Sequence, residues 1–131
     1  MASSHKLAAA LAQRLNNIVP APFHLSADNG HVNIHNADVL DTICYTPDIV
    51  EDESRDLTDL LETVTLSVLS SVQDIISEET RDAWPSTDGR TMALPDARID
   101  AEAVHLWYGE EESPLVRLPP IRLDEIMEGR A

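Results

Sequence analysis

Three histidines offer the most specific chemistry in this sequence. His24, His31 and His35, together with Asp28, alternate with apolar residues on both sides of an Asn-Gly pair, so a hairpin would place all four on its outer face. Imidazole nitrogens and a carboxylate are suitable ligands for zinc or nickel. Because the imidazoles are spread along two strands and do not converge on one point, we expect a polar surface facing solvent, with no metal and no cofactor.

The sequence contains no pattern typical of an enzyme. Its four glycines are dispersed, so no glycine-rich loop could hold a phosphate, and H-E-x-x-H and G-x-S-x-G are both absent. Acidic pairs are abundant, but they fall in predicted turns and linkers, where solvent would not separate their pKa values. Cys44 is the only cysteine, and between Ile43 and Tyr45 it is expected to be a small buried side chain. We therefore predict no catalytic residue.

The hairpin that would position the histidines is the clearest local element. Asn29-Gly30 favours a type I′ turn, because both central residues of that turn need positive φ. In the resulting register every apolar residue of the two strands lies on one face, which supports the assignment independently. The predicted cross-strand pairs are Asp28 with His31, Ala27 with Val32, and Leu25 with Ile34.

Two helices are predicted from apolar residues at helical spacing. The first spans residues 4–19 and ends before Pro20. The second spans residues 56–80, where the helical register persists for about 20 residues. Residues 63–68 also alternate like a strand, but the length of the helical register on both sides favours the helix.

The remaining elements are shorter. Residues 38–45 fit a third strand better than a short helix, because Val39 is one of several strand-forming residues there. Residues 98–108 predict one strand, and residues 115–118 predict its return. A last helical turn fits residues 123–129.

These elements predict one α+β domain over residues 1–131. An acidic linker is expected at 48–55 and a Pro/Gly-rich loop at 85–97. The expected architecture is an antiparallel sheet with two helices packed on it, in the order α-β-β-(β)-α-β-β.

Two surfaces are expected to contact a partner protein. The second helix has no charged residue from position 63 to 73, so either a second layer covers it or a partner contacts it. The strand over 98–108 is apolar on both faces at its end, so it should be central in the sheet or covered twice. Because two helices cannot easily cover both sides of the sheet, we expect the face opposite the helices, with Val104, Leu106 and Tyr108, to stay open. Aromatic rings beside turns can also anchor a partner. The predicted partner-binding residues are Leu66, Ser70, Gln73, Trp84, Val104, Leu106 and Tyr108.

The chain is strongly acidic. Nine basic residues against 24 acidic ones give a net charge of −15, which argues against direct binding to nucleic acid or to an anionic membrane. No apolar run approaches the ~20 residues of a membrane span, and Gln13 and Arg14 interrupt the apolar stretch near the start, so we expect a protein of the cytoplasm or of a virion. The acidity favours either a well-solvated surface or a face complementary to a basic partner.

Together these features predict a non-enzymatic protein-binding module: a chaperone, an adaptor or an immunity-type inhibitor of a partner protein. In layout, the element order, small size and acidity are similar to those of secretion chaperones that keep effectors unfolded. The partner would be another protein or a second copy of the chain. The alternative is a structural virion component or an acidic inhibitor that mimics DNA, which would need acids spaced like phosphates along one face.

Overall fold

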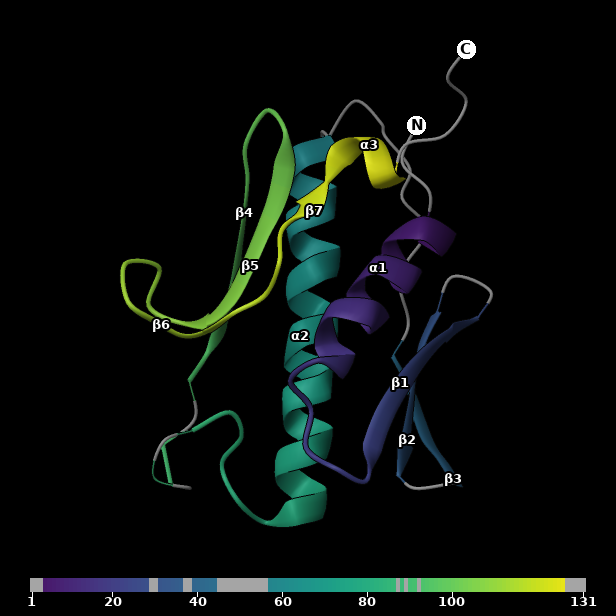
Figure 1. Ribbon diagram of the computed structural model, residues 1–131, viewed down its shortest axis with the longest axis vertical. Coiled ribbons are helices and arrows are strands. Elements are labelled where there is room, and N and C mark those ends of the chain that lie inside the picture. Colours follow the sequence, from purple (N-terminus) through teal and green to yellow (C-terminus); the bar gives the residue numbers. More distant parts are fainter. Residues whose placement is uncertain are drawn as a thin grey trace.

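Helix α2 (Leu57–Thr80) runs through the middle of the molecule, with an antiparallel sheet on either side of it (Figure 1). The computed structural model describes residues 4–28, 31–36, 39–44, 57–86, 88, 90–91 and 93–126. After helix α1 (Ser4–Asn16), the first sheet contains β1 (Phe23–Asp28), β2 (His31–Asn36) and β3 (Val39–Cys44). The second sheet contains β4 (Pro95–Ile99), β5 (Ala103–Gly109), β6 (Pro114–Arg117) and β7 (Ile121–Arg122), and helix α3 (Leu123–Ile126) follows it.

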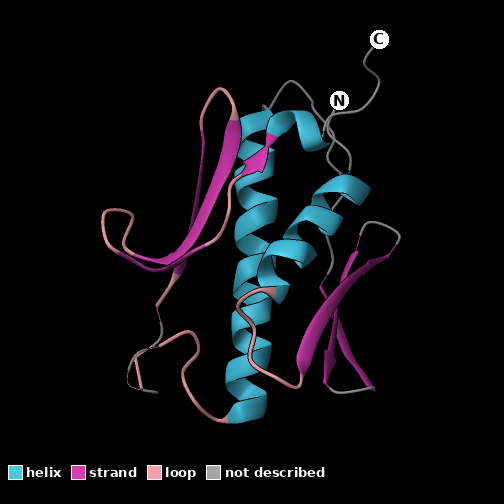
Figure 2. Cartoon of the chain, viewed as in Figure 1, coloured by secondary structure: helices cyan, strands magenta, loops and turns pink. Residues whose placement is uncertain are grey.

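The α+β class, the antiparallel pairing and the predicted element order as far as α2 are confirmed, while after α2 the structure has four strands where two were predicted. The strands divide into two sheets instead of the one expected: β1-β2-β3, and β4-β5-β6 with β7 also paired to β5 (Figure 2). The reason lies in α2, where only Thr63 and Ser67 are exposed among residues 63–73. Because this helix is apolar around most of its circumference, it buries a sheet on each side. A second layer therefore explains the charge-free stretch.

The predicted hairpin register is confirmed. In the structure Leu25 pairs with Ile34, and the neighbouring pairs follow as expected. Strand β3 adds to β2 over Val39–Cys44, so the strand assignment for this segment is also correct. The Asn29-Gly30 turn, Tyr45 and the acidic linker at 48–55 lie outside the described residues.

The long helix is confirmed over nearly its predicted length, whereas the first helix ends earlier than predicted. After Asn16 the N–H groups of Ile18 and Val19 both donate to the carbonyl of Leu15, at 3.0 Å each, which closes the helix with a turn before Pro20. None of the described helices is long and apolar enough to cross a membrane.

The strand predicted over 98–108 is two strands. Strand β4 begins at Pro95, inside the predicted loop, and a tight turn at residues 100–102 joins it to β5. The Asp100 carboxylate makes this turn by accepting the N–H groups of Glu102 (2.8 Å) and Ala103 (3.0 Å). An aspartate that bonds the backbone two residues later ends a strand, and this local hydrogen bonding overrides the apparent alternation.

One hydrophobic core joins both sheets to the helices. On β5 the side chains of Val104, Leu106 and Tyr108 are fully buried in it, and the Tyr108 hydroxyl donates to the carbonyl of Leu69 in α2 (2.9 Å). The prediction that these three residues form an open face opposite the helices is therefore wrong. Both faces of β5 are apolar enough to be buried. The face that carries Tyr108 packs against α2, where the Leu69 carbonyl accepts the hydrogen bond that a buried tyrosine hydroxyl needs.

Candidate protein-binding surface

The face of the second sheet that is turned away from α2 carries Trp107. Across the sheet, Trp107 is paired with Asp96 on β4 and with Arg117 on β6, and one step along the same face His105 is paired with Arg98. These five side chains are called the outer face below. They share a side because residues alternate along a strand, and Leu106 and Tyr108 point the other way into the core.

A short acidic loop between β5 and β6 folds back over the outer face. The carboxylate of Glu111 accepts a hydrogen bond from Arg98 Nε at 2.7 Å. The backbone carbonyl of Glu111 accepts from an Arg117 guanidinium nitrogen at 2.8 Å. Residues 110–113 are themselves exposed and are closed by a bond from the Ser113 N–H to the Glu110 carbonyl (3.2 Å). This loop, residues 110–113, is called the acidic loop below.

The covering is thin, yet Trp107 lies completely beneath it. Only 1% of Trp107 is exposed, although the Arg98 and Glu111 side chains beside it are 54% and 46% exposed. The Arg117 guanidinium carbon lies 5.5 Å from the centre of the Trp107 ring, within the range of a cation–π contact. Among the described residues, the long side chain of Arg117 is therefore the group that lies over the Trp107 ring.

The indole Nε1 of Trp107 is buried and has no hydrogen-bond partner among the residues described. A buried N–H without an acceptor costs about 1–3 kcal/mol, and such groups are rare in folded proteins. Together with the guanidinium groups of Arg98 and Arg117, the outer face offers hydrogen-bond donors, one of which is unused.

Two exposed leucines stand at the end of the same strand. The Gly109 N–H donates to the carbonyl of Leu94 (2.9 Å), and a Cβ on Gly109 would lie 3.6 Å from Leu115 Cβ. Leu94 is 68% exposed and Leu115 is 39% exposed, and they are the large exposed hydrophobic residues of the described chain. The outer face thus continues into an apolar patch two residues beyond Trp107.

The side chains of His105 and Asp100 meet at the other end of the outer face, with His105 Nε2 2.7 Å from Asp100 Oδ2. The backbone N–H of Glu102, the His105 side chain and the N–H of Ala103 lower the pKa of Asp100 to about 2. Because most of these bonds come from the turn, the pair fixes the turn between β4 and β5.

The other predicted partner residues do not come together on a surface. Gln73 is buried, and its amide donates to the Ala93 carbonyl at 2.5 Å. Leu66 and Ser70 are half-buried on α2. Trp84 is half-buried and packs edge-on against Tyr108, with ring centres 5.5 Å apart.

The histidine face has the predicted register and a compact local structure. The rings of His24 and His35 stack with centres 4.7 Å apart, and Ser26 Oγ lies 3.0 Å from His35 Nε2. His31 is paired with Asp28 beside the hairpin turn. Across the described ranges, no three His, Cys, Asp or Glu side chains are placed to hold a metal ion.

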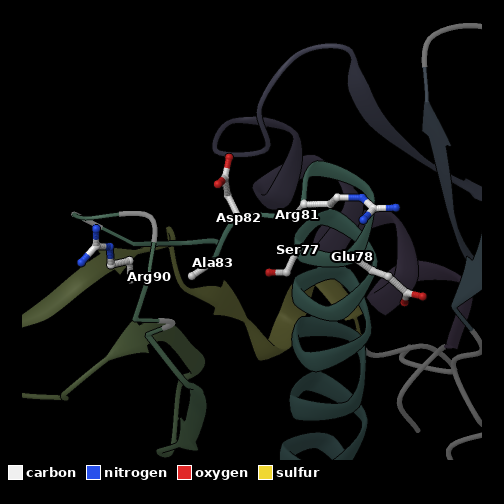
Figure 3. A pocket seen from close by; sticks show the side chains of 6 residues that line it. All are labelled: Ser77, Glu78, Arg81, Asp82, Ala83 and Arg90. Atoms are coloured by element: carbon white, nitrogen blue, oxygen red, sulfur yellow. The ribbon is translucent and has the colours of Figure 1, made fainter.

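An open pocket of about 560 Å³ lies beside the C-terminal end of α2 (Figure 3). Its charged side chains do not converge, because Arg81 and Arg90 point in opposite directions in this view. The other lining residues are Ser77, Glu78, Asp82 and Ala83. This arrangement supplies no set of groups aimed at one ligand, so the outer face is the stronger candidate.

Sequence reasoning gave Trp107, Arg98, Glu111 and Arg117 no functional role. The sequence nevertheless contains a signal. Strands β4 and β6, which lie on either side of β5, each carry an arginine (Arg98 and Arg117) on the same face of the sheet as Trp107. Comparison of the chain with family models, with curated proteins and with solved structures finds no match.

Proposed function

We propose that this protein is a non-enzymatic protein-binding module that binds its partner through the outer face. The observation that carries this proposal is Trp107, a fully buried tryptophan with an unused N–H donor beneath exposed side chains. Tryptophan and arginine dominate the energetic centres of protein interfaces. The outer face combines one tryptophan with two arginines and borders the exposed leucines at positions 94 and 115.

The shape of this surface supports binding over catalysis. Its titratable pair, His105 and Asp100, belongs to a backbone turn, and its centre is an aromatic ring without a neighbouring nucleophile among the described contacts. An aromatic anchor surrounded by polar side chains is the usual anatomy of a protein interface, which fits a chaperone, an adaptor or an inhibitor.

Site-specific photocrosslinking in the source cells tests this proposal. A benzoylphenylalanine at Leu115 should give one discrete crosslinked species, and the charge reversal Arg117→Glu should abolish it. The matched control carries the same probe at Asp74, an exposed position of α2. Failure to crosslink at position 115, or the same species from both positions, would refute the proposal. A crosslink to a second copy of the chain would identify the partner as the protein itself.

A further inference from the structure

We propose that the outer face binds an acidic peptide segment of the partner, and that the acidic loop occupies this site until the partner displaces it. This inference rests on the proposed function and names both the partner chemistry and its control. It starts from the donors on the outer face and from the segment that already lies against them.

The outer face offers donors to whatever covers it. Arg98 and Arg117 have no acceptor atoms in their side chains, and the indole of Trp107 is also a donor only. In the structure Arg98 donates to the carboxylate of Glu111, and Arg117 donates to the backbone carbonyl of the same residue. The Trp107 N–H has no acceptor among the described residues. A ligand that satisfies all three groups must bring acceptors, and an acidic peptide has both carboxylates and carbonyls.

The acidic loop shows that such a segment fits. One residue, Glu111, supplies both acceptors: its side chain reaches Arg98 across β5, and its carbonyl reaches Arg117. The loop is thus an internal ligand that satisfies two donors and leaves the third unused. A partner segment that also accepts a hydrogen bond from Trp107 Nε1 would make one more hydrogen bond to the outer face than the loop does. Binding of the partner segment would therefore be favoured over binding of the loop.

The loop is held weakly enough to leave. Its ion pair joins two side chains that are each about half exposed, a type that contributes little because water and salt screen it. At one end of the loop Gly109 has a φ of +107°, and at the other end Pro114 begins β6. The loop can therefore open without disturbing the core residues of β5.

A basic partner is the competing occupant. Glu110 and Glu112 are exposed on the same loop, and the net charge of −15 would speed the approach of a cation. Such a partner would bring backbone carbonyls but no carboxylate for Arg98, and its positive charge would be repelled by both guanidinium groups. The donor set therefore favours the acidic peptide, and the two occupants are separated by experiment.

The first experiment tests whether the loop covers Trp107. The chain has two tryptophans, so Trp84→Phe makes Trp107 the only fluorescent indole. In that background, Glu111→Ala should increase acrylamide quenching of Trp107 about two- to fivefold, because a surface ion pair of ordinary strength is lost. Glu112→Ala removes an equal charge from the same loop and should leave quenching unchanged. Equal quenching in the two variants would overturn the covering role.

The second experiment tests the ligand. The Trp84→Phe/Glu111→Ala protein is titrated with the synthetic peptide Gly-Glu-Glu-Glu-Ser-Pro-Leu and with versions carrying Gln or Lys in place of Glu. The acidic peptide should shift Trp107 emission to shorter wavelength and bind about tenfold more tightly than the Gln peptide, because charge-assisted hydrogen bonds are the stronger ones. The double substitution Arg98→Gln/Arg117→Gln should abolish the shift.

The outcomes separate the two proposals. If the Lys peptide protects Trp107 and the acidic peptide does not, the partner chemistry is wrong while binding at the outer face stands. If no peptide changes Trp107 emission, the acidic-peptide inference fails. The proposed function fails with it only when crosslinking at Leu115 is also negative.

Discussion

Replacement of Asn16 by alanine should destabilise the protein by disconnecting the end of α1 from the edge of the first sheet. The Asn16 carboxamide donates to the carbonyl of Leu25 (2.8 Å) and accepts from the N–H of the same residue (2.7 Å). This pair of bonds imitates a neighbouring strand on the side of β1 that does not face β2. Substitution with alanine removes both bonds and leaves the edge of β1 uncapped.

The expected loss follows from these two bonds. Each buried or partly buried hydrogen bond contributes about 1 kcal/mol net, so two contribute about 2 kcal/mol. The higher helix propensity of alanine returns up to about 0.5 kcal/mol at the end of α1. The free energy of unfolding should therefore fall by about 1.5 kcal/mol in Asn16→Ala. Asn16→Asp should lose more at neutral pH, because a carboxylate cannot donate to the Leu25 carbonyl and repels it.

Equilibrium unfolding in urea, followed by far-ultraviolet circular dichroism, measures the difference. The matched control is Asn17→Ala, one residue later, where the side chain is exposed and the backbone bond to Arg14 is retained. The control should change the free energy of unfolding by less than about 0.5 kcal/mol. If Asn16→Ala and Asn17→Ala lose the same stability, the carboxamide does not act as a strand cap and the reasoning is refuted.

Two further predictions concern the second sheet. Gly109→Ala should cost about 1–3 kcal/mol in thermal or urea unfolding, because its φ is +107° and a Cβ would lie 2.8 Å from the backbone nitrogen of Leu115; an unchanged midpoint would contradict this geometry. Asp100 has its pKa lowered to about 2 from 3.8, first by the Glu102 N–H, so its contribution to stability is complete above about pH 4 and disappears as the pH falls through 2. Asp100→Asn should therefore be less stable than the parent at pH 6, with a gap that closes between pH 4 and 2; a gap independent of pH would count against it.

Local signals predicted the elements that depend on neighbouring residues. The Asn-Gly pair and the alternation around it were sufficient for the β1–β2 register, because a two-residue turn leaves no freedom in the pairing. The apolar periodicity of residues 56–80 was sufficient for α2 even across its β-branched stretch. In both cases the information lies within a few residues of where it acts.

The outer face could not be predicted in the same way, since it depends on distant contacts. Trp107 and Tyr108 are adjacent and both aromatic, and alternation alone does not say which one faces the core. It is Tyr108 that faces the core, where its hydroxyl donates to the carbonyl of Leu69, 39 positions away in the sequence. Similarly, Arg14 looks like a helix-surface charge in the sequence but is buried against Glu125 and the carbonyl of Pro120 near the other end of the chain.

The edges of β1 and of the second sheet are closed to strand addition, which makes a sheet face the better candidate surface for the proposed partner. An edge strand with free N–H groups invites pairing by another chain, and proteins commonly block such edges. Here α1 blocks β1 through Asn16, and carboxylates block the outward N–H groups of β4 and β7. These carboxylate caps are Asp96 on Ala97 (2.8 Å), Glu62 on Ile99 (3.1 Å) and Glu125 on Arg122 (3.1 Å).

Strand β6 is short and is followed by Pro119 and Pro120, which cannot donate to a neighbouring strand. Strand addition is thus opposed at the described edges of the second sheet, whereas the outer face of the same sheet is contacted, within the described residues, by the short acidic loop. Some of the acidic side chains of this chain therefore have a structural task as backbone caps. The net charge of the protein therefore does not by itself indicate the chemistry of the proposed partner, and that proposal rests on the arginine and tryptophan donors of the outer face.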